Sequence, residues 1–78
     1  MVIMERALIL IKTESPSETK VFDRVKSHPK VVEANMIYGP YDLYTVCEDN
    51  TTVGIKRTVL EIRNILGVVS TLTCLIAD

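Results

Sequence analysis

Residues 36–46, MIYGPYDLYTV, join two strand-like segments through a short turn. Gly39 can adopt a positive φ angle and Pro40 has a fixed φ angle, so these two residues interrupt both segments. The flanking segments are rich in Val, Ile, Tyr and Thr, which suit a pleated surface, and cover residues 31–38 and 43–47. This pattern predicts a central β-hairpin.

Upstream of the hairpin, residues 5–12 (ERALILIK) form a nearly continuous apolar run, as expected for an interior strand covered on both faces. Residues 15–18 (SPSE) match a capping box with Ser15 as the N-cap. A helix is therefore predicted to begin at Pro16 and to end before Pro29, which cannot continue it. Its apolar face consists of Val21, Phe22 and Val25.

Downstream of the hairpin, Asn50 is the predicted N-cap of a second helix over residues 51–66, with Gly67 as its C-terminal stop. Gly54 lies near the start of this helix, where glycine weakens it. The apolar positions recur at intervals of about four and three residues, at Ile55, Val59, Ile62 and Leu66. Residues 68–77 alternate between two faces and predict a last strand.

The predicted order is βαββαβ, which is typical of a ferredoxin-like α+β sandwich with a four-stranded antiparallel sheet and two helices on one face. Residues 1–78 then form a single domain. The usual strand order, 4-1-3-2, places Cys47 and Cys74 on opposite sides of the first strand, about 10 Å apart. We therefore expect no disulfide between them and interpret both as small buried hydrophobes.

The chain of 78 residues is 47% hydrophobic, which is high for a domain that has helices to cover only one face of its sheet. The second face carries apolar residues on every strand, and a bare apolar face of this kind marks an association surface. We therefore expect dimerisation through the sheets. No apolar run approaches the length of a membrane span, and the N-terminal residues do not resemble a signal peptide, so we expect a cytoplasmic protein.

A formal charge of −1 gives no basic footprint for nucleic acid, so we expect no direct binding to it. The two cysteines form neither a CxxC motif nor a Cys/His cluster, so we predict no metal site and no redox motif. The single histidine, His28, lies at the predicted end of the first helix without a carboxylate placed to assist it. We interpret it as a surface residue and predict neither a catalytic residue nor a cofactor.

Two segments carry a resemblance to a known family: residues 31–50, VVEANMIYGPYDLYTVCEDN, and residues 65–78, ILGVVSTLTCLIAD. With the amphipathic helix between them, they resemble the ligand-binding RAM domain of the leucine-responsive/AsnC family of transcription regulators. The most specific parts are Gly39-x-Tyr41-Asp42 and Gly67-Val68-x-x-Thr71-x-Thr73. The resemblance implies dimers that pair through their sheets, ring-like higher oligomers, and binding of free amino acids or similar metabolites between dimers.

By matching position, the resemblance assigns ligand binding to two groups of residues: Gly39, Pro40, Tyr41 and Asp42 in the turn, and Thr71 and Thr73 in the last strand. Backbone N–H groups of the turn and threonine hydroxyls suit a ligand carboxylate, and Asp42 suits an ammonium group. Family members carry an N-terminal helix-turn-helix that this sequence lacks. We therefore expect a stand-alone RAM protein that acts through other proteins, for example in mixed assemblies with full-length regulators.

Other interpretations remain open at this point. In one alternative, Asp42 is simply a turn residue without a ligand, and Thr71 and Thr73 are ordinary strand residues. The chain can be a dimeric ferredoxin-like enzyme, although it offers no His or carboxylate in a cavity apart from Asp42. It can also be a structural oligomerisation partner without a ligand.

Overall fold

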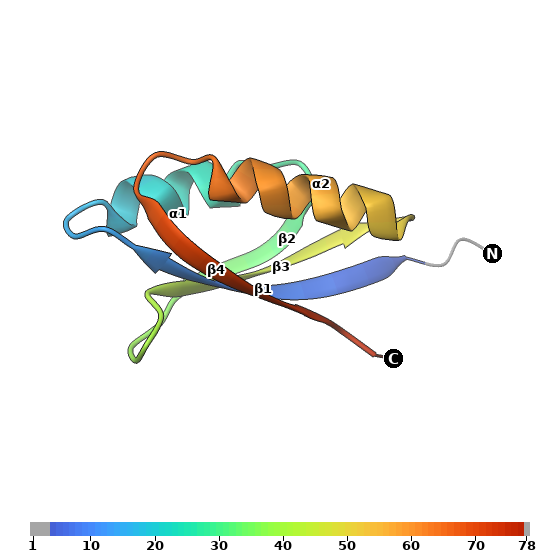
Figure 1. Ribbon diagram of the computed structural model, residues 1–78, viewed down its shortest axis with the longest axis horizontal. Coiled ribbons are helices and arrows are strands. Elements are labelled where there is room, and N and C mark those ends of the chain that lie inside the picture. Colours follow the sequence, from blue (N-terminus) through green and yellow to red (C-terminus); the bar gives the residue numbers. More distant parts are fainter. Residues whose placement is uncertain (1–3, 78) are drawn as a thin grey trace.

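The structure is a computed structural model that describes residues 4–77. Its element order is β1 (Glu5–Thr13), α1 (Glu18–Lys26), β2 (Val31–Met36), β3 (Leu43–Asp49), α2 (Thr52–Arg63) and β4 (Val68–Leu75). The strands form one antiparallel sheet in the order β2-β3-β1-β4, and both helices lie over the same face (Figure 1). The predicted ferredoxin-like fold and strand order are confirmed. No helix among the described residues is both long enough and apolar enough to cross a membrane.

The core lies between the helices and the sheet, with β1 at its centre. Ala7, Ile9 and Ile11 alternate along β1, point toward the helices and are fully buried. Val21 and Val25 of α1 lie in the same cluster, as their spacing predicts, with Leu43, Cys47, Ile55 and Ile62. Full burial of a Val, Leu or Ile side chain contributes about 1.5–3 kcal/mol, so these side chains of the cluster stabilise the fold substantially.

The start of each helix differs from its predicted position. Helix α1 has Ser17 as its N-cap, because the Ser17 amide donates to the Glu14 carbonyl (2.6 Å) and closes a turn ahead of the helix. Ser15 is therefore not the N-cap, and the Ser15–Pro16 peptide bond is cis. Helix α2 has Thr51, not Asn50, as its N-cap, because only the Thr51 hydroxyl accepts a hydrogen bond from the third helical amide, that of Gly54 (2.9 Å).

The other boundaries shift by a few residues. Strand β2 ends at Met36, because the Ile37 amide donates to the Asp42 carbonyl (3.0 Å) and closes the hairpin earlier than predicted. Strand β3 continues to Asp49 and β4 ends at Leu75. Helix α2 ends at Arg63 with Asn64 as its C-cap, so Gly67 is not the residue that stops it, contrary to prediction. Gly67 lies in the turn before β4 with φ +102°, a conformation that favours glycine.

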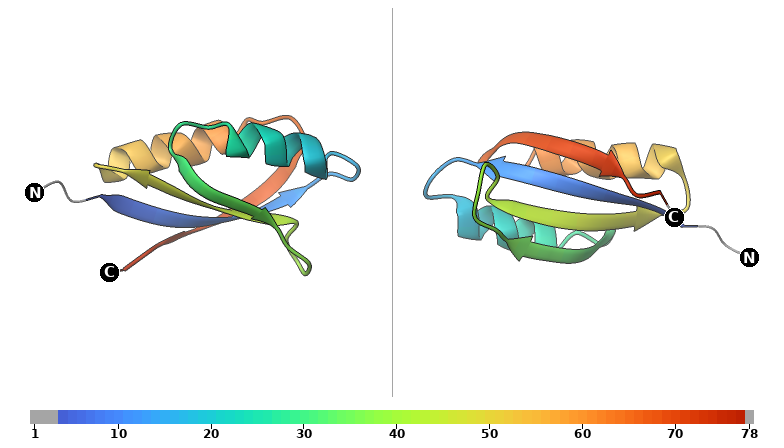
Figure 2. Two further views of the ribbon diagram at one scale, coloured as in Figure 1. Left: turned by 180° about the vertical axis from the view of Figure 1, so that it is seen from behind. Right: turned by 90° about the horizontal axis from the view of Figure 1, so that it is seen from below.

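The second face of the sheet has no helix over it (Figure 2). Strand register brings Leu8 opposite Val46 and Cys74, and Leu10 opposite Tyr44 and Leu72, all on this face. We call these six residues the open face. Cys74 is exposed here, so the expectation that it is a buried hydrophobe is wrong within one chain. Cys47 is buried in the core, and burial raises the pKa of its thiol. Both cysteines are free, as expected.

Candidate functional site

The β2–β3 hairpin projects from the sheet on the side of the open face (Figures 1 and 2). Gly39 at its tip has φ +139°, a conformation that favours glycine, and a side chain there would meet open space. Pro40 is exposed, and its carbonyl accepts from Lys12 Nζ (3.3 Å). Tyr41 is half-buried and Tyr38 is fully exposed. The hairpin therefore presents backbone groups and aromatic rings beyond the end of the sheet.

Asp42 fastens the hairpin to the end of β1. Its carboxylate oxygen Oδ2 accepts from the Thr13 amide (2.7 Å) and the Thr13 hydroxyl (3.1 Å), and its own amide donates to the Ile11 carbonyl (2.9 Å). The other carboxylate oxygen, Oδ1, has no hydrogen-bond partner within residues 4–77. Asp42 also borders a hollow of about 320 Å³ that is lined by Glu18, Met36, Ile37 and Tyr38. The residue thus combines a structural contact with a free acceptor.

Thr71 and Thr73 lie on β4 and share the face of Ile11 and Ile9, toward the helices. The Thr71 hydroxyl accepts a hydrogen bond from Arg63 Nε (2.9 Å). Thr73 borders a groove of about 330 Å³ between α2 and β4. We call it the α2–β4 groove; its other lining residues are Thr52, Ile55, Lys56, Val59, Leu60, Arg63 and Leu75.

The two groups of predicted ligand-binding residues do not meet within one chain. Ile11 of β1 pairs with Leu43, which follows Asp42, on one side and with Thr71 on the other. Two strand spacings, about 10 Å, therefore separate the hairpin from the threonines. The hairpin also lies toward the open face, whereas the threonines point to the helix side. The two groups are therefore separate within one chain, and we call each of them a predicted half-site.

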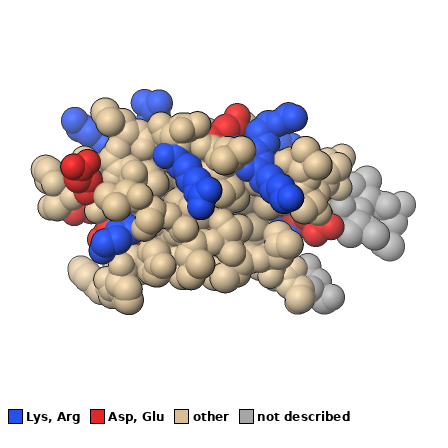
Figure 3. Space-filling view, in the orientation of Figure 1, with Lys and Arg blue, Asp and Glu red and all other residues tan. Residues whose placement is uncertain are grey.

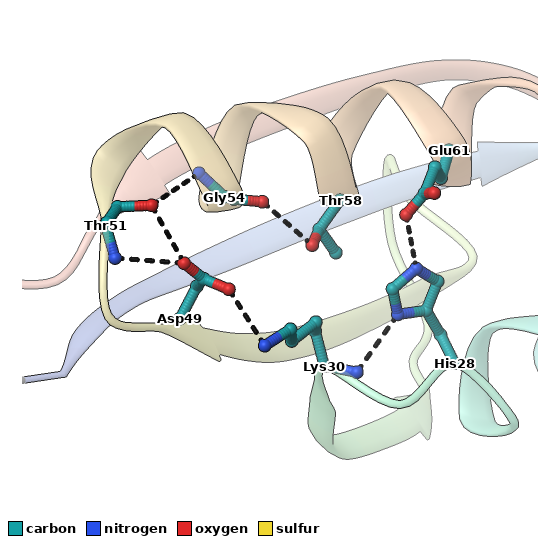
Figure 4. A network of polar contacts seen from close by, with 7 residues as sticks. All are labelled: His28, Lys30, Asp49, Thr51, Gly54, Thr58 and Glu61. Atoms are coloured by element: carbon teal, nitrogen blue, oxygen red, sulfur yellow. Dashed lines mark hydrogen bonds and ion pairs between the residues drawn. The ribbon is translucent and has the colours of Figure 1, made fainter.

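A second polar cluster lies between the two helices and is shown in Figure 4. His28 Nε2 lies 2.8 Å from Glu61 Oε1, and its Nδ1 accepts from the Lys30 amide (3.1 Å). The expectation that no carboxylate assists His28 is therefore wrong, because the fold brings Glu61 from α2 to it. Both ring nitrogens are occupied, however, so neither can take up a substrate proton or bind a metal without breaking a contact.

The same cluster holds the start of α2 in place. Asp49 accepts from Lys30 Nζ (2.9 Å), the Thr51 amide (2.9 Å) and the Thr51 hydroxyl (3.0 Å). These contacts, first among them that with Lys30, lower the pKa of Asp49 to about 2. Gly54 lies beside it, and a Cβ atom there would overlap the Asp49 carboxylate, which would have to move out of these contacts. The Asp49-x-Thr51-x-x-Gly54 spacing was a signal of this arrangement that sequence reasoning missed.

We predict that Gly54→Ala destabilises the protein, although alanine in a helix is ordinarily better than glycine by about 1 kcal/mol. The new methyl group displaces the Asp49 carboxylate and so removes the contacts that start α2. In an Asp49→Ala background the clash is absent, and Gly54→Ala should then stabilise by about 1 kcal/mol. Urea unfolding of the four proteins in this cycle measures the effect. Equal changes in both backgrounds would contradict the role assigned to Asp49.

The other polar side chains of residues 4–77 form small separate contacts, such as that of Tyr44 with Glu33. Residues 4–77 hold no group of three or more His, Cys, Asp or Glu side chains that could bind a metal ion. Tyr44 donates its hydroxyl proton to Glu33 and accepts from Asn35 (3.0 Å), and the Glu33 contact raises the pKa of Tyr44. Basic side chains lie over the helix layer with acidic ones among them, and they form no continuous basic surface in the view of Figure 3.

Comparison with solved structures identifies the family. FFRP-DM1, known from a crystal structure, is 30% identical with a TM-score of 0.89, and the match covers 94% of this chain and 99% of that one. FFRP denotes a feast/famine regulatory protein, the group that includes the leucine-responsive and AsnC regulators. The chain belongs to this family. Its RAM-type fold is thus established by a relative that it matches over nearly the whole length of both chains.

Two larger regulators share the fold of this RAM domain at lower identity. AsnC of E. coli is 18% identical with a TM-score of 0.88, and the match covers 95% of this chain and 51% of AsnC. The regulator NMB0573 of Neisseria meningitidis, solved as a complex with L-Met, is 16% identical with a TM-score of 0.83, covering 95% and 50%. The chain therefore spans about half the length of these regulators. No family model and no curated protein sequence matches it.

Proposed function

We propose that this RAM domain binds a free amino acid or a similar small metabolite and, as an oligomer, passes that signal to transcription regulators. The observation that carries the proposal is Asp42, a carboxylate that is fixed by Thr13 through one oxygen and borders a hollow with the other one free. Family membership and the L-Met complex of NMB0573 support an amino acid as the ligand.

The groups in the two half-sites suit a zwitterion. Asp42 Oδ1 can accept from the ligand ammonium, and the backbone N–H groups near Gly39 and Tyr41 can donate to its carboxylate. Thr73 offers a hydroxyl, and Arg63, held by Thr71, places a cation near the same groove. The apolar lining of both hollows favours a ligand with an apolar side chain.

The open face supports a homodimer that pairs sheet against sheet. Leu8, Leu10, Val46, Leu72 and Cys74 lie together there with no helix over them, and burial of such a patch between two copies is favourable. Two polar contacts share this face, the Arg6–Glu48 ion pair and the Tyr44–Glu33 hydrogen bond, and both can persist in that arrangement. A single chain of this size buries too little surface to be very stable alone.

We predict that Leu72→Glu abolishes the homodimer, because it places a charge on a face that is apolar in both copies. Val53→Glu is the matched control, since Val53 is 67% exposed on α2, away from the open face. Sedimentation velocity measures the species. In the assembled protein, Cys74 should resist a thiol reagent that labels it in Leu72→Glu. Rapid labelling of Cys74 in the unmutated protein, with unchanged sedimentation of Leu72→Glu, would contradict sheet pairing.

The partners in this proposal are full-length regulators of the same family. Mixed assembly with full-length family regulators places the effector site beside their DNA-binding parts, and this domain then needs no direct contact with nucleic acid. Its net charge of −1 supports a role without direct binding to nucleic acid. Such a role belongs in the cytoplasm, where free amino acids and transcription regulators meet.

A thermal-shift screen against the twenty amino acids tests ligand binding directly. A ligand at 100 times its dissociation constant stabilises the folded protein by about 2.7 kcal/mol, which gives a clear shift in Tm for a small domain. The absence of any shift with all twenty, at millimolar concentrations, would instead favour a structural oligomerisation partner.

We predict that Asp42→Asn lowers the affinity for the amino acid found in the screen by about ten- to a hundredfold, because a charge-assisted hydrogen bond is worth roughly 1.5–3 kcal/mol. Asparagine retains an oxygen that can accept from Thr13, so the fold should persist. Thr13→Val is the control: it removes one contact to Asp42 but leaves the charge in place. Calorimetric titration of the three proteins measures the difference, and unchanged affinity in Asp42→Asn would leave Asp42 only its structural role.

A further inference from the structure

We propose that a hollow between α1 and α2 binds the phosphate group of a small molecule, held by Arg24 of α1 and Arg57 of α2. The hollow has a volume of about 470 Å³, and both arginines border it. We call it the interhelical hollow. Neither the β2–β3 hairpin nor β4 contributes a residue to it, so it is separate from both half-sites and goes beyond the proposed function.

Positive charge predominates around the interhelical hollow. Its charged and titratable side chains are the basic residues Arg24, His28, Lys30 and Arg57 and the acidic residues Asp49 and Glu61. Even with His28 neutral, three cations face two carboxylates, which leaves an excess of one positive charge. The whole chain has a net charge of −1, so this local excess is opposite in sign to the rest of the molecule. A concave surface of this kind attracts small anions.

Both carboxylates in the interhelical hollow are already engaged (Figure 4). Asp49 Oδ1 lies 2.9 Å from Lys30 Nζ, and Oδ2 accepts from the amide and the hydroxyl of Thr51. Glu61 Oε1 lies 2.8 Å from His28 Nε2. Arg24 and Arg57, by contrast, make no side-chain hydrogen bond and no ion pair within residues 4–77. Two guanidinium groups on different helices therefore border one hollow with their donors unused.

The engaged pairs also fix the two sides of the hollow relative to each other. His28 follows α1 and Glu61 lies on α2, so their contact joins the two helices across the hollow. Lys30 precedes β2 and binds Asp49 at the end of β3, beside the start of α2. The helices that carry the two arginines are thus held in place before a ligand arrives. A preorganised site loses less entropy on binding, which favours affinity.

The donors suit a phosphate group better than a carboxylate. Each guanidinium presents a planar fork of N–H donors that matches two phosphate oxygens. A phosphate ester has three acceptor oxygens and nearly two negative charges at neutral pH, so it can accept from two arginines at once. Pro29 and Ile65 add apolar surface to the hollow, which leaves room for the organic part of an ester. Free phosphate and a phosphorylated metabolite share this chemistry.

NMR titration of the unmutated protein with inorganic phosphate and, separately, with ribose 5-phosphate tests the site. Constant ionic strength and a pH of about 8 keep the phosphate group close to doubly charged. We expect saturable shifts of the amides of residues 24–30 and 54–61, with a dissociation constant of about a millimolar or lower from two charge-assisted contacts. Tighter binding of ribose 5-phosphate assigns the site to an ester, and tighter binding of inorganic phosphate assigns it to the free ion.

Two variants locate the ligand. Arg24→Gln and Arg57→Gln should each weaken binding about tenfold, because each removes one charge-assisted contact. Both arginines are exposed and unpaired within residues 4–77, so the fold is retained. Lys20→Gln is the matched control, since it removes the same charge from an exposed position on α1 that does not border the hollow, and its affinity should be unchanged.

Three outcomes would overturn the proposal. The first is the absence of saturable shifts with either probe up to about 10 mM, well above the expected dissociation constant. The second is an equal loss of affinity in Lys20→Gln, which would indicate only a general attraction of anions. The third is a set of shifts confined to residues 37–42 of the hairpin. No amino acid is present in this titration, so failure of amino-acid binding leaves the result unaffected.

Discussion

Strand β1 is hydrogen-bonded along both edges, to β3 and to β4, while helices cover only one of its two faces. Its apolar run therefore supplies two surfaces. Ala7, Ile9 and Ile11 build the core beneath the helices, and Leu8 and Leu10 build the centre of the open face. A domain of this size with one buried and one bare apolar face is stabilised most when a second copy covers the bare face. The bare face is thus the physical basis of the proposed sheet-to-sheet dimer.

The same strand divides the candidate site. The hairpin is fastened to one side of the end of β1 by the Asp42–Thr13 contact, and the threonines of β4 lie on the other side. A ligand site that needs both must be built between chains, so ligand binding and oligomer geometry become linked by mass action. Such linkage is what a regulatory module requires, because ligand concentration then shifts the distribution of assemblies.

Much of the fold follows from local patterns. The spacing of Val21 and Val25, the β-branched strands around Gly39-Pro40 and the glycine after α2 predict the element order and the sheet topology. The helix starts were predicted less well, because Ser15 and Asn50 are also good N-cap residues by type. The choice of Ser17 and Thr51 depends on the hydrogen bonds of the turn before each helix, which residue type alone does not reveal.

The contacts that specify the candidate site could not be predicted from the sequence, because they join residues that are far apart in it. Asp42–Thr13, His28–Glu61 and Arg63–Thr71 each join different elements, so they exist only once the sheet and helices are placed. Gly54 is the partial exception. Gly54 follows the N-cap Thr51 by three residues and Asp49 by five, so this spacing can be read from the sequence. The reason for a glycine there is the space taken by the Asp49 carboxylate, which only the structure shows.

Hydrogen exchange with and without saturating amino acid tests the central claim most directly, because it locates the ligand without any mutation. We expect slower exchange of backbone amides in two separate segments, residues 37–42 of the hairpin and residues 70–75 of β4, at one and the same ligand concentration. Protection confined to the cluster between α1 and α2, or to one of the two segments alone, would contradict a site shared between hairpin and strand.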